Sequence, residues 1–390
     1  MYAGKICIAI LLAATAPFAA AQKLVLTNPL NVDRTQEVVE VPLHQVLEQL
    51  HLKPDQAASI VASDAVSGQR LPSQLYSAEA NGQPDQLLLL VQLREHEVER
   101  IVFRTDSQAS AQTALVFGRE APERKDDFAW ENQQVAYRVY GPALQATGEI
   151  ASGIDVWSKR VPNFVIDAFY KRDLEGVHTH NPALSYHKDN GQGLDSYYVG
   201  PSRGCGGTAV FADSKLYVSK NYTTKRTLSN GPIRFAFEVS YAPWDSPQGS
   251  VTETKRITLD AGTHLNKIES TYSFAGSGTL ELAAAIAVHE GAKAEFPLAN
   301  SIASVWDTPQ DASAGRISTG LVVAANQHAR SVEAAGHALM LFTRHSGESF
   351  TYYAGSGWSK ADMPTNDAWK AYLGLQLQMQ EHPILMRWSE

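Results

Sequence analysis

Short apolar stretches of strand length make up most of the chain. Between residues 22 and 117, four of them alternate or run apolar and are separated by turn-forming pairs: KLVLTNPL, QEVVEVPL, DQLLLLVQL and VERIVFRTD. Residues 41–52 instead repeat their apolar positions at helical spacing, which predicts one helix. No group of catalytic residue types gathers in this part, so we expect an accessory β-sandwich-like domain over residues 22–117.

A polar segment, GREAPERKDD, begins at Gly118 and is typical of a linker. Beyond it, apolar stretches of strand length follow one another from 215 to 288, with turns at 230–231, 261–262 and 276–278. This regular spacing predicts a large antiparallel β-sandwich over residues 118–390. It ends in a helix over 367–380 with Asp367 as N-cap. The expected fold class is therefore all-β, with a large antiparallel sandwich preceded by a smaller N-terminal β domain.

The first residues have the pattern of a secretory signal peptide. Lys5 supplies the positive start, residues 6–14 an apolar core, and Ala19 to Ala21 a small-residue cleavage site. We expect cleavage after Ala21 and export to a bacterial periplasm. No later segment stays apolar over the roughly 20 residues that a membrane helix needs, so no membrane span is expected. Cys7 is lost with the signal, which leaves Cys205 without a partner for a disulfide.

The net charge and the aromatic residues indicate which class of molecule the protein binds. The formal net charge is −8 and no tract is rich in Lys or Arg, which argues against a nucleic-acid partner. Trp and Tyr cluster near Gly, Asp and Arg, a combination that suits sugars because their apolar faces stack on aromatic rings while their hydroxyls form hydrogen bonds. The expected partner is an oligosaccharide, and the oligomeric state stays open.

Residues 186–207, YHKDNGQGLDSYYVGPSRGCGG, combine ionisable and aromatic side chains with six glycines. Such a run favours neither a regular helix nor a regular strand, so we expect a shaped loop, and loops of this kind often carry function. Its ionisable residues suit β-elimination from a uronic acid, which needs a base for the C5 proton, a partner for the carboxylate and an acid for the leaving oxygen. Candidates are His187 and Tyr197 or Tyr198 for proton transfer, with Arg203 and Lys188 for the carboxylate.

Other constellations keep alternatives open. Asp155, Trp157 and Lys159 are spaced two apart, which places them on one face of a strand, either lining a cleft or facing solvent. Hydrolysis would need two carboxyl groups across a cleft, for which the chain offers Glu131, Asp155, Asp189 and Asp195.

A divalent metal is a further possibility, with weakly specific candidate ligands at His178, His180 and His289. Residues 189–195 faintly resemble a calcium loop but lack its closing Glu. Cys205 has no cysteine-protease signature around it and is interpreted as a small buried residue.

Several motifs resemble the domain of unknown function 4861 family, exported proteins associated with breakdown of uronate-containing polysaccharides. They are AWEN…AYRVYGPAL, SGIDVWSKRV, the loop YHKDNGQGLDSYYVGPSRGCGG and the late YYAGSGWSK. The resemblance implies a large β-sandwich of the galactose-mutarotase-like kind. It also implies chemistry like that of relatives thought to dehydrate a uronate at the non-reducing end of an oligosaccharide.

Carried over to this chain, the resemblance implies catalytic roles for His187, Lys188, Tyr197 and Arg203. It implies substrate contacts at a wider set: Trp130, Tyr140, Asp155, Trp157, Asp195 and Tyr198. The resulting hypothesis is a periplasmic carbon-oxygen lyase, a dehydratase or an exo-lyase, that acts on pectin- or ulvan-like uronate oligosaccharides. A mutarotase-like epimerase, a glycosidase and a non-catalytic carbohydrate-binding protein are the alternatives.

Overall fold

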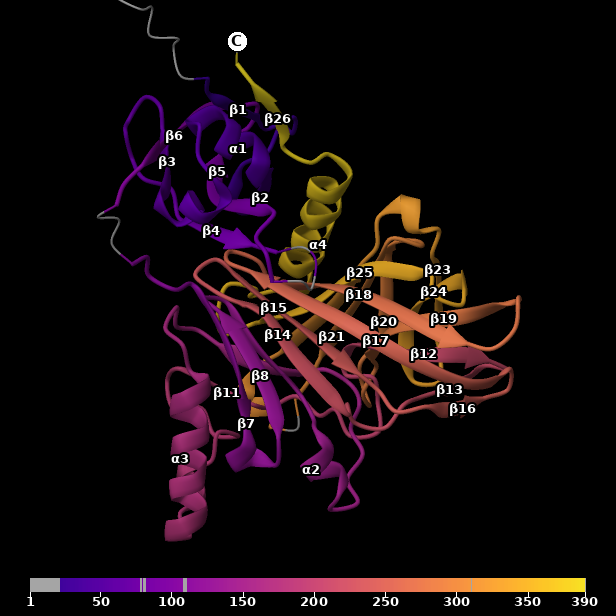
Figure 1. The fold of residues 1–390 in the computed structure, drawn as a ribbon. Helices are drawn as coiled ribbons and strands as arrows, with labels where there is room; N and C mark the ends of the chain where they lie inside the picture. The colour runs from indigo at the N-terminus through magenta and orange to yellow at the C-terminus, as the bar shows by residue number, and fades with distance from the viewer. Residues whose placement is uncertain (1–21, 78, 80–81, 108–110, 310, 390) are drawn as a thin grey trace, which may run out of the picture.

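The computed structural model describes residues 22–77, 79, 82–107, 111–309 and 311–389, and consists mainly of antiparallel sheets (Figure 1). The predicted signal peptide, residues 1–21, lies outside the described residues. The all-β prediction, a large sandwich with a smaller N-terminal β part, is confirmed. In the described part of the chain, each helix is too short or too polar to cross a bilayer.

Two small sheets and a helix form the N-terminal unit. The strand order of the first is β26 (Leu385–Trp388), β1 (Leu24–Thr27), β6 (Val98–Thr105) and β3 (Ile60–Asp64). The second has the order β2 (Arg34–Pro42), β5 (Gln86–Leu93) and β4 (Ser73–Tyr76). Helix α1 (Leu43–Leu50) lies within the range where helical spacing predicted it. The C-terminal strand β26 thus pairs with β1 and belongs to the N-terminal unit (Figure 1).

A five-stranded sheet follows, in the order of the chain. Its strands are β7 (Val116–Ala121), β8 (Asp127–Asn132), β9 (Val135–Val139), β10 (Asp155–Lys159) and β11 (Gly193–Leu194). The predicted division after residue 117 therefore falls inside β7. The short helix α2 (Pro142–Gln145) follows β9, and the longer helix α3 (Ile166–Thr179) covers one face of this sheet.

Two further sheets form the large sandwich. The five-stranded one has the order β13 (Lys215–Tyr217), β12 (Cys205–Ala212), β19 (Thr279–Ala287), β24 (His337–His345) and β23 (Arg330–Ala334). The nine-stranded one runs β14 (Thr224–Asn230), β15 (Arg234–Ser240), β17 (Gly249–Asp260), β18 (Leu265–Phe274), β25 (Ser349–Trp358), β22 (Ile317–Val322), β21 (Ile302–Asp307) and β20 (Ala294–Leu298), with β16 (Trp244–Ser246) on β17.

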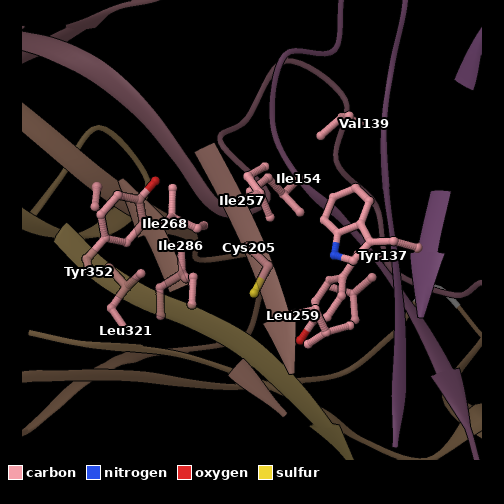
Figure 2. Close-up of a cluster of buried hydrophobic side chains, with 14 of the residues drawn as sticks. Tyr137, Val139, Ile154, Cys205, Ile257, Leu259, Ile268, Ile286, Leu321 and Tyr352 are labelled. Carbon is pink, nitrogen blue, oxygen red and sulfur yellow. The ribbon is translucent and has the colours of Figure 1, made fainter. Parts of the chain in front are cut away.

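The main core lies on the inner face of the nine-stranded sheet. Both five-stranded sheets contribute to it, since Trp130 of β8 and Leu282 of β19 belong to the same buried cluster as Ile257 of β17. Cys205, on β12, sits within this cluster among apolar side chains such as Ile257 and Leu259 (Figure 2). The prediction that Cys205 is a small buried residue is confirmed, because the side chain is fully buried and its thiol donates to the Gly355 carbonyl oxygen at 3.2 Å.

Helix α4 (Asn366–Glu381) packs Trp369 and Leu373 against β21 and β22. Asp367, the predicted N-cap, lies inside the first turn, so that prediction is wrong. The cap is Thr365, whose hydroxyl accepts a hydrogen bond from the Ala368 N–H at 3.1 Å. Asp367 instead places negative charge near the positive end of the helix dipole, which is also favourable.

Candidate functional site

The loop at residues 186–199 is the feature on which the predicted site residues depend. Its backbone is held by β11, which pairs Gly193 with Lys159 of β10, and by a hydrogen bond from the Asp195 N–H to the Tyr186 carbonyl oxygen at 2.9 Å. Gly193 has φ +147°, and a Cβ there would lie 2.1 Å from the Ser158 carbonyl oxygen. Only glycine permits the loop to approach the strand this closely.

Arg138 of β9 holds the loop in place through hydrogen-bonded ion pairs. Its guanidinium donates to Asp155 at 3.0 Å from Nε and to Asp195 at 2.9 Å from Nη2, and Asp127 lies 3.5 Å away. All four side chains are buried, so three carboxylates surround one cation out of contact with solvent. The Tyr140 hydroxyl completes the network by donating to Asp155 at 2.8 Å.

Burial raises the pKa of two carboxyl groups in this cluster. Burial raises the pKa of Asp127 to about 6, despite the opposing charge of Arg138. Burial, followed by the charge of Asp155, also raises the pKa of Asp195 well above its usual value. Since these carboxylates are committed to Arg138, the cluster acts as a rigid support for the loop and does not offer a free carboxyl pair for hydrolysis.

His187 projects from this support toward solvent, with 59 % of its side chain exposed. Its Nδ1 lies 2.9 Å from the Asp195 carbonyl oxygen, an atom that can only accept a hydrogen bond. In the neutral ring the proton therefore sits on Nδ1, and Nε2 carries the lone pair. This arrangement prepares His187 Nε2 as a proton acceptor.

A pocket of about 380 Å³ lies beside the other end of the loop. It is lined by Ser196, Tyr197 and Tyr198 from the loop and by residues of three other stretches: His289, Glu290, Asp307, Thr308, Pro309 and Ile317. Its volume is within the range of small-ligand sites. Three of the predicted site residues, Tyr197, Tyr198 and His289, thus meet in one pocket.

His289 is held by hydrogen bonds at both ring nitrogens. Nδ1 contacts Asp307 Oδ2, and Nε2 lies 2.7 Å from the Tyr198 carbonyl oxygen. A carbonyl can only accept a hydrogen bond, and so can an ionised carboxylate, so the doubly protonated ring satisfies both contacts. Burial disfavours the charged ring, but the hydrogen bond and charge of Asp307 outweigh it and raise the pKa of His289. These contacts therefore favour the charged form of His289 and fix the ring at the pocket wall.

Tyr197 packs edge-on against His289, with ring centroids 5.2 Å apart. Burial raises the pKa of Tyr197 well above its usual value, so its hydroxyl stays protonated and can donate a proton or a hydrogen bond. Beside it, the side chain of Tyr198 is more than half exposed at the pocket.

Lys188 is an exposed residue of the same loop. A hydrogen bond from Ser313 lowers the pKa of the fully exposed Asp311, and the charge of Lys188 contributes in the same direction.

Arg203, predicted to bind the carboxylate, lies elsewhere. It is 2 % exposed, and its guanidinium donates to Ser152 Oγ at 3.0 Å inside the core. That buried position leaves no face for a substrate, so we assign it a structural role. The chain packs closely beside Cys205, since Gly206 has φ +98° and a Cβ there would lie 2.4 Å from Ala354 Cβ.

Trp130 and Trp157, predicted to contact substrate, are each 0 % exposed. Trp130 donates from Nε1 to Asn266 Oδ1 at 2.7 Å, and Trp157 stacks against Tyr186 beneath α3. Asp155, Trp157 and Lys159 do share one face of β10, but α3 covers that face. Lys159 is bound there by Glu131 at 2.7 Å, which removes Glu131 from the hydrolytic candidates.

The three suggested metal ligands do not meet. His178 and His180 are exposed at the end of α3, whereas His289 is engaged by Asp307 and Tyr198. Within the described ranges, no group of three or more His, Cys, Asp or Glu side chains is arranged to hold a metal ion. Asp189, the remaining hydrolytic candidate, forms a partly exposed ion pair with Arg160.

Two residues important to the site carried little signal in the sequence. Asp307 ends an ordinary strand pattern, SIASVWD, and becomes significant only because β21 brings it to His289. Arg138 lies in an alternating strand, and nothing local shows that three carboxylates from other elements converge on it.

The family model described as domain of unknown function (DUF4861) matches residues 26–386. The chain belongs to the DUF4861 family. This DUF4861 protein is 31 % identical over 365 residues to uncharacterized protein P7 of Formosa agariphila, a match that covers 89 % of this chain and 88 % of the relative. The motifs of the 186–207 loop had indicated this membership, and it is confirmed.

Among solved structures, the DUF4861 chain is similar to an α-mannosidase from Enterococcus faecalis V583, with a TM-score of 0.45 and 10 % identity. It is also similar to a glycosyl hydrolase family 38 protein from Enterococcus faecalis, with a TM-score of 0.48 and 11 % identity. Both matches cover 95 % of this chain, which spans 46 % and 47 % of those chains.

Proposed function

We propose that this protein is an exported carbon-oxygen lyase that acts on uronic-acid-containing oligosaccharides by β-elimination. The observation that carries the proposal is the pocket at His289. His289, whose charged form is favoured, and the phenol of Tyr197 line it, and the same loop presents Nε2 of His187, the acceptor nitrogen of the neutral ring. These are the three kinds of group that β-elimination from a uronate requires.

Each group has a defined role in the proposed reaction. His289, charged by its contact with Asp307, attracts the uronate carboxylate and stabilises the charge that develops when C5 loses its proton. His187 Nε2 takes that proton, the C4–oxygen bond breaks, and a C4–C5 double bond forms. The Tyr197 hydroxyl donates a proton to the departing oxygen. The exposed Lys188 of the same loop adds positive charge that attracts an anionic substrate.

The loop itself sets the distance between base and cation. His187 is bound to the carbonyl of Asp195 and His289 to the carbonyl of Tyr198. Three residues span at most roughly 11 Å, so the two imidazoles are anchored to points no farther apart than that. This spacing allows both to serve one bound oligosaccharide.

A second candidate, glycoside hydrolysis, is favoured by one observation: Glu290 and Asp307 line the same pocket. Two carboxyl groups beside a sugar are the requirement for that reaction. Asp307, however, is hydrogen-bonded to His289, so of the two carboxyl groups it is the one already bound to the protein. We therefore rank hydrolysis second.

The test is incubation with defined uronate oligosaccharides of pectic, ulvan-like and glycosaminoglycan type, followed in the near ultraviolet where the C4–C5 unsaturated product absorbs. We expect absorbance to rise with at least one substrate. His187→Gln, Tyr197→Phe and His289→Gln should each lower the rate by roughly 10²-fold or more, as loss of a general acid or base does. A parallel assay for reducing sugar detects hydrolysis.

The matched control is His44→Gln, since His44 is exposed on α1 of the N-terminal unit. This variant should keep the wild-type rate. No absorbance change with any uronate substrate would refute the lyase, and reducing-sugar release without new absorbance would establish the hydrolase instead. Turnover that survives all three site substitutions would move the reaction to another part of the molecule.

A further inference from the structure

A second groove, of about 420 Å³, lies between the N-terminal unit and the outer face of the nine-stranded sheet. One wall is β2 and another is α4, and the floor is formed by β17, β18 and β25. Figure 1 shows α4 and the N-terminal unit at one end of these strands. The groove shares no lining residue with the pocket at His289.

The floor of this groove is a row of polar side chains set by strand register. Thr258 of β17 is paired with Lys267 of β18, and Lys267 is paired with Tyr353 of β25. Directly opposed residues project from the same face of a sheet, so a hydroxyl, an ammonium and a phenol stand side by side. Lys267 is only loosely paired, with Nζ 3.7 Å from Glu269, and 42 % of its side chain is exposed.

Gln380 of α4 supplies an unpaired amide at the wall. Neither its side-chain oxygen nor its nitrogen forms a hydrogen bond with a described residue, although both atoms are buried. Buried polar groups normally have partners, and an amide without one at the wall of a groove points to a ligand that both donates and accepts hydrogen bonds.

The walls are fixed in place before any ligand binds. Arg234 of β15 forms a two-point contact with Asp260 at 2.6 and 2.7 Å and also binds Glu40 of the N-terminal unit. Gln74 of β4 accepts hydrogen bonds from the backbone of Ile233 and Arg234, each at 2.8 Å. A groove braced in this way loses little conformational freedom on binding, which favours affinity.

The charges that line the groove restrict the class of ligand. Three cationic side chains stand against four carboxylates: Arg234, Arg256 and Lys267 against Glu37, Glu40, Asp260 and Glu269. Glu37 is already paired with Arg34 at 2.6 Å, so the charges around the groove balance and favour neither an anionic nor a cationic ligand, and an apolar ligand would leave many polar groups unpaired. A hydroxyl-rich neutral ligand satisfies both kinds of partner.

We propose that this groove binds neutral sugar units and is a carbohydrate site separate from the pocket at His289. The half-buried ring of Tyr353 provides an apolar surface for a sugar face, while Thr258, Lys267 and Gln380 hydrogen-bond its hydroxyls. The inference does not depend on the reaction proposed above, because it concerns binding and uses other residues.

The experiment is isothermal titration calorimetry of the full mature chain with neutral tetrasaccharides of glucose, xylose, mannose and rhamnose, with inorganic phosphate as comparator. At least one neutral tetrasaccharide should bind. Lys267→Met and Gln380→Met should each weaken that binding at least tenfold. Lys215→Met, on the exposed strand β13 of the other sheet, and His289→Gln, in the separate pocket, should leave it unchanged.

Thermal melting of each variant verifies that it is folded. Absence of binding by any neutral tetrasaccharide would overturn the proposal, as would equal binding by both groove variants and wild type. Binding of phosphate alone would overturn the ligand class. Loss of neutral-sugar binding in His289→Gln but not in Lys267→Met would transfer the site to the other pocket.

Discussion

Replacing Asp127 by Asn should stabilise the protein at neutral pH, although it removes a carboxylate beside Arg138. Asp127 is 3 % exposed and lies 3.5 Å from the Arg138 guanidinium, at the limit of a hydrogen bond. Asp155 and Asp195 bind Arg138 more closely and already supply two negative charges. The third carboxylate therefore loses its hydration without gaining a close partner.

The magnitude follows from the pKa. Burial raises the pKa of Asp127 from 3.8 to about 6 in the folded protein. A shift of about two units corresponds to about 3 kcal/mol at about 1.4 kcal/mol per unit. Because the folded pKa is the higher one, this stability is present below pH 3.8 and is lost as pH rises through about 6. Asn stays neutral throughout and avoids the loss.

The assay is urea unfolding followed by tryptophan fluorescence at pH 4 and pH 7. Asp127→Asn should match wild type within about 1 kcal/mol at pH 4 and exceed its free energy of unfolding by about 3 kcal/mol at pH 7. Asp245→Asn, at an exposed carboxylate on β16, is the control and should change neither value. A variant less stable than wild type at pH 7 would show that the ion pair with Arg138 outweighs burial, and would refute the reasoning.

Four further results are expected. Arg138→Met should lower the free energy of unfolding by about 3–5 kcal/mol in the same assay, since it leaves buried carboxylates uncompensated; a loss below about 1 kcal/mol would contradict the network. Cys205→Ala should keep full lyase activity, and native Cys205 should resist thiol reagents because burial raises the pKa of its thiol; rapid labelling would argue against this. Gly206→Ala should destabilise by about 2 kcal/mol or more, judged by thermal melting, because of its positive φ and the clash with Ala354; an unchanged melting temperature would disprove the clash. Lyase activity should fall as pH rises through the raised pKa of His289, because the imidazolium is lost; a His289→Gln variant that keeps this limb of the pH profile would assign it to another group.

Much of the fold was predictable because strand patterns are local. Each short stretch shows its own spacing of apolar residues and its own turns. The alternating stretches predicted the sandwich, and the helical spacing predicted the helix at α1. Helix α3 escaped prediction for a tertiary reason. Its first N–H groups, from Val165 and Ile166, are capped by Glu131 of the distant strand β8, so no capping residue marks its start in the sequence.

By itself, the sequence determined the all-β class, the family and the loop that carries His187 and Tyr197. All three follow from the residue types within short stretches, because strand patterns, family motifs and glycine-rich loops each extend over only a few residues. Only the tertiary structure decided which side chains of that loop meet a partner. It placed Asp307 against His289, collected three carboxylates on Arg138, and buried Arg203 and Trp157. Pairing and burial of charge depend on segments distant in the chain that pack together, and local patterns do not contain that information.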